Sequence, residues 1–173
     1  MEYQNSINIF TGFILLMAVG LVFSFYYLRN LRQQAQIEWK KLRRMVSIRL
    51  DLVPLLCENV TTLGIVRPEL LAELIQLRGE SWEIRECTGA KVNKELLISQ
   101  KIHEIWVALG KFRQVQLVAL QKEMAEVAQK IEQEEESYNL KVRKYNQIYR
   151  IIPFRFFFQI FRFQTMSVFE FEA

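Results

Sequence analysis

A long apolar stretch dominates the N-terminal part of the chain. Residues 9–28 contain no charged side chain, and about 20 apolar residues in a helix span the roughly 30 Å hydrocarbon core of a bilayer. Tyr26 and Tyr27 follow where an interfacial aromatic belt is expected, and Arg29 and Arg32 come soon after them. The pattern predicts a transmembrane helix with these four residues at its second interface.

A cleaved signal peptide is the alternative for this stretch. Such a peptide has a basic start, a shorter apolar core and a small-residue cleavage site, whereas this chain starts with an acidic Glu2 and passes from the apolar run into Tyr-Tyr-Leu-Arg. We therefore expect an uncleaved, single-pass anchor. Basic residues at positions 29, 32, 40, 41, 43 and 44 follow the span and none precedes it. This asymmetry predicts an outside N-terminus and a cytoplasmic body.

Beyond the anchor, apolar residues recur at intervals of three and four, the spacing of one face of a helix. Between Leu31 and Asn59 this stripe comprises Ala35, Trp39, Leu42, Val46, Leu52, Val53 and Leu56. No helix breaker separates the stripe from the anchor, so we expect one helix to continue out of the membrane as a stalk. Pro54 is expected to kink or loosen this helix, and Thr61, Thr62 and Gly64 to end it.

Three further helices are predicted. The first runs from Pro68 to about Glu86, the next begins near Lys91, and the last runs from about Phe112 to Arg150. An eleven-residue recurrence, which would allow one straight rod across the last two, links Ile98, Leu109, Leu120 and Ile131. We favour a break at Gly110, because two segments can then fold back and bury their stripes.

The predicted fold class is therefore all-α: an N-terminal transmembrane helix that continues into an antiparallel four-helix bundle. The expected parts are an anchor over residues 1–30, a helical body over residues 31–152 and an aromatic, basic segment over residues 153–173. The Phe-rich run within the last part is too short to span a bilayer. It either caps the bundle or lies among lipid headgroups. Its expected contact residues are Arg155, Phe156, Phe157, Phe158, Phe161 and Arg162.

Charge adds one constraint to this picture. The formal net charge is +4, but acidic and basic residues alternate through the body, and the excess lies beside the anchor and near the C-terminus. That distribution suits an anionic membrane surface better than a nucleic-acid groove, so we expect no nucleic-acid partner. Four glutamates within residues 132–136 are expected to form a solvated face, with a cation site as the alternative.

Candidate chemistry is sparse. Cys57 and Cys87 lack the spacing of a metal or redox motif, and we expect buried thiols. His103 and Glu104 lack the second histidine of a zinc protease motif, because position 107 is Val107. Glycine-rich phosphate loops and serine nucleophile motifs are also missing. We therefore expect no catalytic residue, no metal, no cofactor and no small-molecule substrate.

Two local patterns stand out in the body. The first contains Arg49, Asp51 and Pro54, and the second contains Tyr138, Asn139, Tyr145 and Asn146. Tyr138 and Tyr145 lie seven residues apart on one helix face, so both rings can enter the core while the adjacent asparagines bond to a neighbouring helix. Arg49 and Asp51 are candidate partners for such polar groups.

The two motifs, their order and the anchor resemble the LemA family of bacterial membrane-anchored proteins. The resemblance covers the whole chain and implies an anchored four-helix bundle at the cytoplasmic face of the bacterial inner membrane. Two departures indicate a divergent member. The residues after the second motif are aromatic and basic where the family has a small-residue, glycine-containing segment, and the aromatic-proline pair usual between the third and fourth helices is missing around Gly110.

The family has no established general activity. Some members are tied to membrane compartments of magnetotactic bacteria, including magnetosomes, and others are encoded near membrane proteases. We expect a non-enzymatic scaffold that binds the lipid bilayer, forms homo-oligomers and recruits other membrane proteins. The alternative is a regulatory adaptor or sensor for a membrane protease or a stress response.

Overall fold

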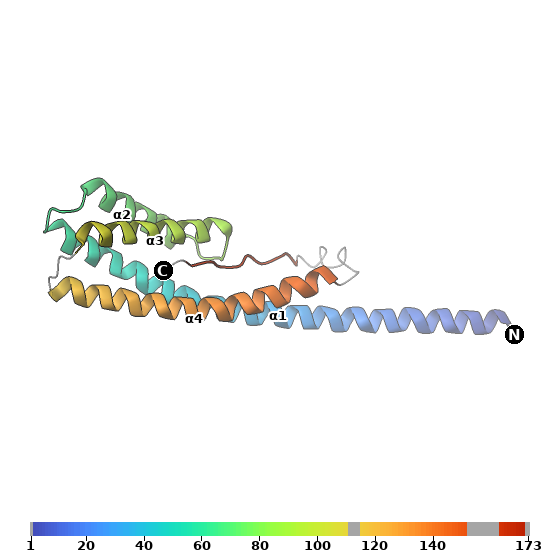
Figure 1. Cartoon of the computed structure of the whole chain (residues 1–173). Coiled ribbons are helices and arrows are strands. Elements are labelled where there is room, and N and C mark those ends of the chain that lie inside the picture. Colours follow the sequence, from blue (N-terminus) through green and yellow to red (C-terminus); the bar gives the residue numbers. More distant parts are fainter. Residues whose placement is uncertain (1, 111–114, 152–162, 172–173) are drawn as a thin grey trace.

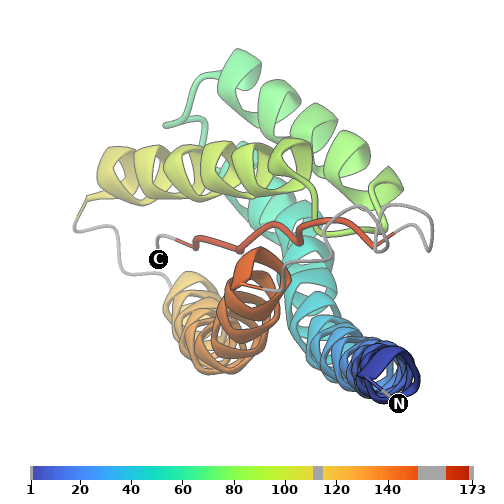
Figure 2. The same ribbon diagram turned by 90° about the vertical axis from the view of Figure 1, so that its right-hand side faces the viewer.

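The computed structural model describes residues 2–110, 115–151 and 163–171, which form four helices and one extended segment (Figure 1). The helices are α1 (Glu2–Thr61), α2 (Pro68–Glu83), α3 (Gly89–Leu109) and α4 (Val115–Ile151). The helix α4 packs along the body part of α1, α2 pairs with α3, and the extended segment runs between these two pairs (Figures 1 and 2). The predicted all-α bundle is confirmed.

The helix α1 is a single helix of 60 residues, about 90 Å long at 1.5 Å per residue. Its early apolar side chains face outward: Phe13 is 62% exposed and Leu16 is 73% exposed, whereas Leu28 is fully buried. Within the described residues, α1 is the one helix that is long and apolar enough to cross a membrane. The helix continues through Pro54, so the predicted continuity of the apolar stretch and the stalk is confirmed.

One face of α1 forms the centre of the bundle from Leu28 onward. Its buried positions follow each other at intervals of three and four: Leu28, Leu31, Ala35, Trp39, Leu42, Val46, Arg49, Val53, Leu56 and Val60. Each large apolar side chain buried in this way stabilises the fold by about 1.5–3 kcal/mol. One of these positions, Arg49, carries a charge and therefore needs polar partners inside the core.

The helices end at residues whose backbone conformation or side-chain hydrogen bonds stop the helix. Gly64 and Gly110 have positive φ angles of 63° and 55°, which only glycine adopts without strain, so the predicted ends of the first and third helices are confirmed. The hydroxyl of Thr88 caps α3 by accepting a hydrogen bond from the backbone N–H of Lys91 at 3.3 Å. The helix α2 ends at Glu83 instead of Glu86, because Ile84 has an extended backbone.

Candidate functional site

Polar side chains of α4 hold residues 163–171 in an extended conformation. The Asn139 amide nitrogen donates to the carbonyl oxygen of Phe169 at 2.5 Å, and its amide oxygen accepts from the N–H of the same residue at 2.9 Å. Asn146 makes the same pair with the backbone of Met166, at 2.8 and 2.9 Å. Each side-chain amide thus takes the place that a peptide group occupies in an antiparallel β-ladder.

Four more α4 side chains extend this contact. Three tyrosine hydroxyls donate to backbone carbonyls: Tyr138 to Ser167 at 2.8 Å, Tyr145 to Gln164 at 2.8 Å and Tyr149 to Phe163 at 3.4 Å. The Glu135 carboxylate accepts from the N–H of Phe171 at 3.0 Å. We call these six α4 residues (Glu135, Tyr138, Asn139, Tyr145, Asn146 and Tyr149) the backbone clamp, and residues 163–171 the C-terminal segment.

The spacing of the clamp matches the spacing of an extended chain. Asn139 and Asn146 lie seven residues apart on α4, and their partners Phe169 and Met166 lie three residues apart on the C-terminal segment. Seven helical residues rise about 10.5 Å and three extended residues about 10.2 Å. The repeat of the Tyr-Asn motif is therefore in register with the peptide groups that it binds.

This arrangement corrects the expected partners of the second motif. The prediction that Tyr138 and Tyr145 enter the core is correct, since both are fully buried. The prediction that the asparagines bond to a neighbouring helix is wrong, because they bond to extended backbone. Glu135 belongs to the acidic run expected to be solvated, yet it is half-buried and bonded to Phe171 and Asn139.

Burial keeps the tyrosine hydroxyls of the clamp in their protonated form. Desolvation raises the pKa of Tyr138, and it raises the pKa of Tyr145 as well. Both phenols therefore remain protonated donors over the physiological pH range. Burial also raises the pKa of Glu135, aided by the nearby charges of Glu132 and Glu170 and opposed by the N–H of Phe171.

The side chains of the C-terminal segment pack onto α1 as well. Phe169 is fully buried, and its ring lies 5.8 Å from the ring of Trp39, which in turn lies 5.5 Å from Tyr138. Trp39 is fixed by a hydrogen bond from its indole nitrogen to the carbonyl oxygen of Arg85 at 3.1 Å. The C-terminal segment is thus a structural part of the core, in which Phe169 packs against both α1 and α4.

The other end of the C-terminal segment meets α1 where burial of that helix begins. The Phe163 ring lies 5.6 Å from the Phe25 ring, and the Arg32 guanidinium lies 5.9 Å from the Phe163 centroid. Both rings also line a groove of about 600 Å³ that carries the basic residues Arg29, Arg32 and Lys40.

The residues expected at the membrane interface lie on α1 beside this groove. Tyr26 is 63% exposed and Tyr27 is 39% exposed, Arg29 is exposed, and Arg32 is half-buried. The remaining interface residues fall outside the described part of the chain: Arg155, Phe156, Phe157, Phe158, Phe161 and Arg162. The described contacts of Phe163 and Arg32 bring the C-terminal segment to the same end of the body as the α1 interface residues.

A second polar structure, the charge network, joins α1, α2 and α3 inside the bundle. Its members, all at most 3% exposed, are Arg49, Ser81, Lys91 and Glu95. One carboxylate oxygen of Glu95 contacts the Arg49 guanidinium, and the other accepts from the Ser81 hydroxyl and lies 3.0 Å from the Lys91 ammonium. Arg49 also donates to the Ser99 hydroxyl at 2.8 Å.

The charge network corrects the expected partners of the first motif. Arg49 and Asp51 do not bond to the clamp: Arg49 pairs with Glu95, and Asp51 lies on the surface 3.5 Å from Arg78. Pro54 is exposed. Sequence reasoning missed Glu95 and Lys91 altogether. Their positions were a usable signal, because 91, 95, 98, 102, 105 and 109 continue the buried face of α3 at intervals of four and three.

The charge network holds two cations and one anion. Burial lowers the pKa of Arg49, while the charge of Glu95 acts in the opposite direction. The Nε atom of Arg49 is buried without a hydrogen-bond partner in the described part of the chain. The Phe171 ring lies 4.5 Å from the guanidinium, so the end of the C-terminal segment covers the charge network.

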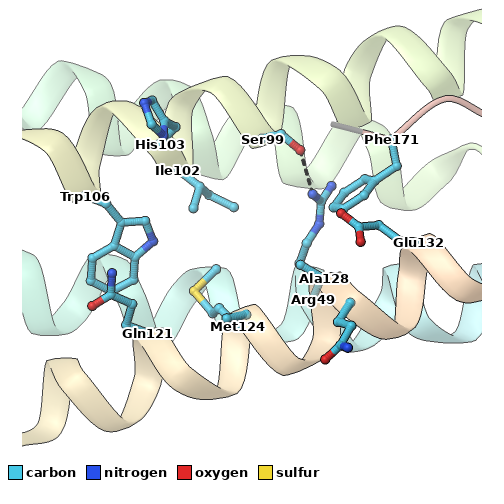
Figure 3. Close-up of a pocket in the computed structure, with 12 residues that line it drawn as sticks. Arg49, Ser99, Ile102, His103, Trp106, Gln121, Met124, Ala128, Glu132 and Phe171 are labelled. Atoms are coloured by element: carbon cyan, nitrogen blue, oxygen red, sulfur yellow. Dashed lines mark hydrogen bonds between the residues drawn. The ribbon is translucent and has the colours of Figure 1, made fainter. Parts of the chain in front are cut away.

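A cleft of about 380 Å³ opens between α3 and α4 beside Arg49 (Figure 3). Its apolar walls come from Ile102 and Trp106 of α3 and Met124 of α4, and Phe171 lies at the end that contains Arg49. His103 lines the cleft from the surface. Among the described residues there is no group of three metal-ligating side chains. Cys57 is a buried free thiol as expected, whereas the free thiol Cys87 is only half-buried.

The sequence also matches a protein-family model, the LemA family, over residues 38–173. The chain belongs to the LemA family. The match includes both motifs, all of α2, α3 and α4, and the C-terminal segment of this LemA protein. A comparison with curated proteins finds no match. Within this LemA chain, the Tyr-Asn motif therefore has a defined structural task, which is to bind an extended backbone.

Proposed function

We propose that this LemA protein is a non-enzymatic, single-pass scaffold of the bacterial inner membrane, with its N-terminus outside and its helical body in the cytoplasm. The continuity of α1 carries the proposal: exposed apolar side chains such as Leu16 and buried ones such as Leu42 belong to one helix. Exposed apolar surface over a stretch of this length is stable in lipid and unfavourable in water.

The surroundings of Leu28 support the proposed orientation. Tyr26 and Tyr27 are exposed at the point where burial of α1 begins, as expected for rings at the headgroup level. Arg29, Arg32 and Lys40 line one groove directly beyond them. Basic residues close to a cytoplasmic leaflet gain about 1 kcal/mol each from anionic lipids.

The use of polar groups inside the body favours a scaffold over an enzyme. The clamp binds the backbone of the C-terminal segment, and the charge network pairs its charges internally, with Glu95 fully buried between Arg49 and Lys91. Apolar residues remain on the outer faces of the helices, among them Ile48 on α1, Leu97 on α3 and Leu140 on α4. These faces are the proposed contacts for further copies of the chain and for other membrane proteins.

Membrane insertion is tested by placing charges in the exposed apolar part of α1. Leu16→Arg with Val19→Arg should move the full chain out of the carbonate-resistant membrane fraction, because each arginine near the bilayer centre costs about 2.5–3.5 kcal/mol. The matched control is Val107→Arg with Leu140→Arg, at exposed positions of the body. An anchor variant that stays in the membrane fraction would contradict insertion. Cleavage of the body by protease only in inverted vesicles would support the orientation.

Self-association is tested by the mass of the full chain in mild detergent, measured by light scattering. The scaffold proposal expects an assembly of defined size. A monomer at all concentrations would contradict the scaffold and would favour the second candidate, an adaptor for a membrane protease. Pull-down of the tagged full chain from membranes would then identify the protease.

A further inference from the structure

We propose that the backbone clamp is a binding site for an extended polypeptide, and that in the assembled protein it takes the C-terminal segment of a second copy of the chain. This inference rests on the self-association in the proposed function and gives it a structural mode. The described structure contains the same contacts within one chain, with the C-terminal segment on its own α4 (Figure 2).

The first support is that the clamp binds main-chain atoms. Asn139 and Asn146 each satisfy the N–H and the carbonyl of one residue, and the tyrosines bind carbonyls of three others. None of these bonds depends on a covalent connection between α4 and the peptide. A segment from another copy would make the same set of hydrogen bonds.

The second support is the fit of the side chains, which selects the occupant. Phe169 is fully buried against Trp39, and Phe163 is buried beside Phe25. Phe171 lies over the Arg49 guanidinium. An occupant must therefore place large apolar side chains at these three positions. A second copy does so without any adaptation, which favours it over an unrelated peptide.

The third support is the length of chain between α4 and the C-terminal segment. Eleven residues, 152–162, separate Ile151 from Phe163, and such a length can span at most about 40 Å. This reach exceeds the distance of about 8–10 Å between packed helices. Exchange of a segment between identical copies replaces each bond by an identical one, so its cost in free energy is low.

Membrane anchoring would favour this exchange between copies. If α1 spans the membrane, copies are confined to one plane with their clamps at the same height, which raises their effective concentration. A small preference for the exchanged arrangement is then sufficient to connect neighbouring copies. The chain would assemble through a segment that is already part of its core.

Two full-length variants with complementary defects test the exchange. The clamp variant, Asn139→Leu with Asn146→Leu, retains a normal C-terminal segment but loses both amides. The segment variant, Met166→Pro with Phe169→Pro, retains the clamp. It loses the two backbone N–H groups that donate hydrogen bonds to the side-chain oxygens of the asparagines. Differently tagged copies are co-expressed, and their mass and co-purification are measured in mild detergent beside the wild type.

The exchange predicts an assembling wild type, two variants that are each monomeric alone, and a complex when the variants are combined. An assembling wild type without a complex of the variants would overturn the exchange but leave the scaffold intact. A monomeric wild type would overturn both, whatever the variants do. Variants that each assemble alone as the wild type does would also overturn the exchange.

A labelled peptide of residues 163–171 provides a second measurement that does not need assembly. It should bind the full-length segment variant, and the clamp substitutions placed in the same chain should weaken binding roughly 100-fold. A peptide with proline at positions 166 and 169 is the control. Absence of binding to a segment variant that keeps its helical circular dichroism would overturn the binding site. If a double variant loses that signal, the single substitutions Asn146→Leu and Met166→Pro replace it.

Discussion

The charge network and the backbone clamp both place polar groups in an apolar core, but the first relies on charges and the second, apart from Glu135 at its half-buried end, on neutral side chains. Glu95 is fully buried, with Arg49 on one carboxylate oxygen and Lys91 on the other. Removal of Glu95 leaves both cations in the core without an anion. The clamp offers amides and hydroxyls, for example Asn139 on Phe169, and each neutral bond contributes only about 0.5–1.5 kcal/mol.

The difference explains what each structure can hold. A buried charge needs an opposite charge beside it in the core, so the pairs that Glu95 makes with Arg49 and Lys91 fix how the α2 and α3 pair docks on α1. A neutral amide binds any peptide group that reaches it, so the clamp holds a segment that can be exchanged for an equal one. Four predictions test this contrast, from the largest expected effect to the smallest.

Loss of Glu95 should have the largest effect. Glu95→Leu leaves Arg49 and Lys91 buried without an anion, which should lower the free energy of unfolding by about 3–5 kcal/mol. The measurement is urea unfolding of the full chain in mild detergent, followed by circular dichroism. Glu80→Gln, in a half-buried pair with Lys94, is the control and should shift the midpoint far less. Equal shifts of the urea midpoint in the two variants would show that burial does not increase the contribution of the charge network to stability.

Loss of a clamp asparagine should rank second. Asn139→Leu should cost about 2–3 kcal/mol, because it leaves both polar groups of Phe169 buried without a partner. Asn146 is less buried than Asn139, so Asn146→Leu should cost only about 1–2 kcal/mol. Urea unfolding gives the order, and hydrogen exchange at the amides of Phe169 and Met166 shows whether the loss is local. The reverse order would contradict the role of burial.

Loss of the clamp hydroxyls should rank third and depend on pH. Tyr138→Phe and Tyr145→Phe each remove one hydrogen bond and should cost about 1 kcal/mol at neutral pH. In the wild type, burial raises the pKa of both phenols above that of unfolded tyrosine. The folded state therefore keeps protons that the unfolded state loses, and stability should fall as pH rises above about 10. In a double Phe variant this alkaline decrease should be smaller; an unchanged decrease would assign it to other groups.

The smallest effect concerns the acidic end of the clamp. Glu132 and Glu170 raise the pKa of Glu135 by their charges, so Glu132→Gln with Glu170→Gln should lower that pKa towards the ordinary glutamate value. The ionised Glu135 carboxylate accepts a hydrogen bond from the Phe171 N–H. With the two neighbouring charges removed, keeping this carboxylate ionised in the folded state costs less free energy. Stability at pH 7 should then rise by roughly 0.3 kcal/mol. Carbon-13 NMR of the Glu135 carboxyl checks the direction, and a pKa that stays or rises would contradict it.

Most of the helical fold could be predicted because its buried faces repeat at three and four residues. Leu42 and Val53 of α1, and Ile98 of α3, all lie on the predicted stripes, and Gly110 ends α3 with a positive φ angle. The charge network could not be predicted in the same way. Charged residues are normally assigned to solvent, so Glu95 was overlooked although it occupies the buried register of α3.

The partner of the clamp escaped prediction for another reason. The heptad of Tyr138 and Tyr145 was visible in the sequence, but their bonds reach Ser167 and Gln164 through backbone carbonyls. Recognition of backbone leaves no requirement on the side chains at those positions. Ser167 and Gln164 consequently show no pattern that would pair them with α4.

Because α1 is one helix, a tilt of the part proposed to lie in the bilayer would be carried along the helix to the far end of the body. About 33 residues separate Leu28 from Thr61, a length of about 50 Å. Transmembrane helices adjust their tilt to bilayer thickness, and a change of about 10° over this length would move the α1 to α2 turn by about 9 Å. Bilayer thickness would thereby become a mechanical input that sets how neighbouring bodies face one another.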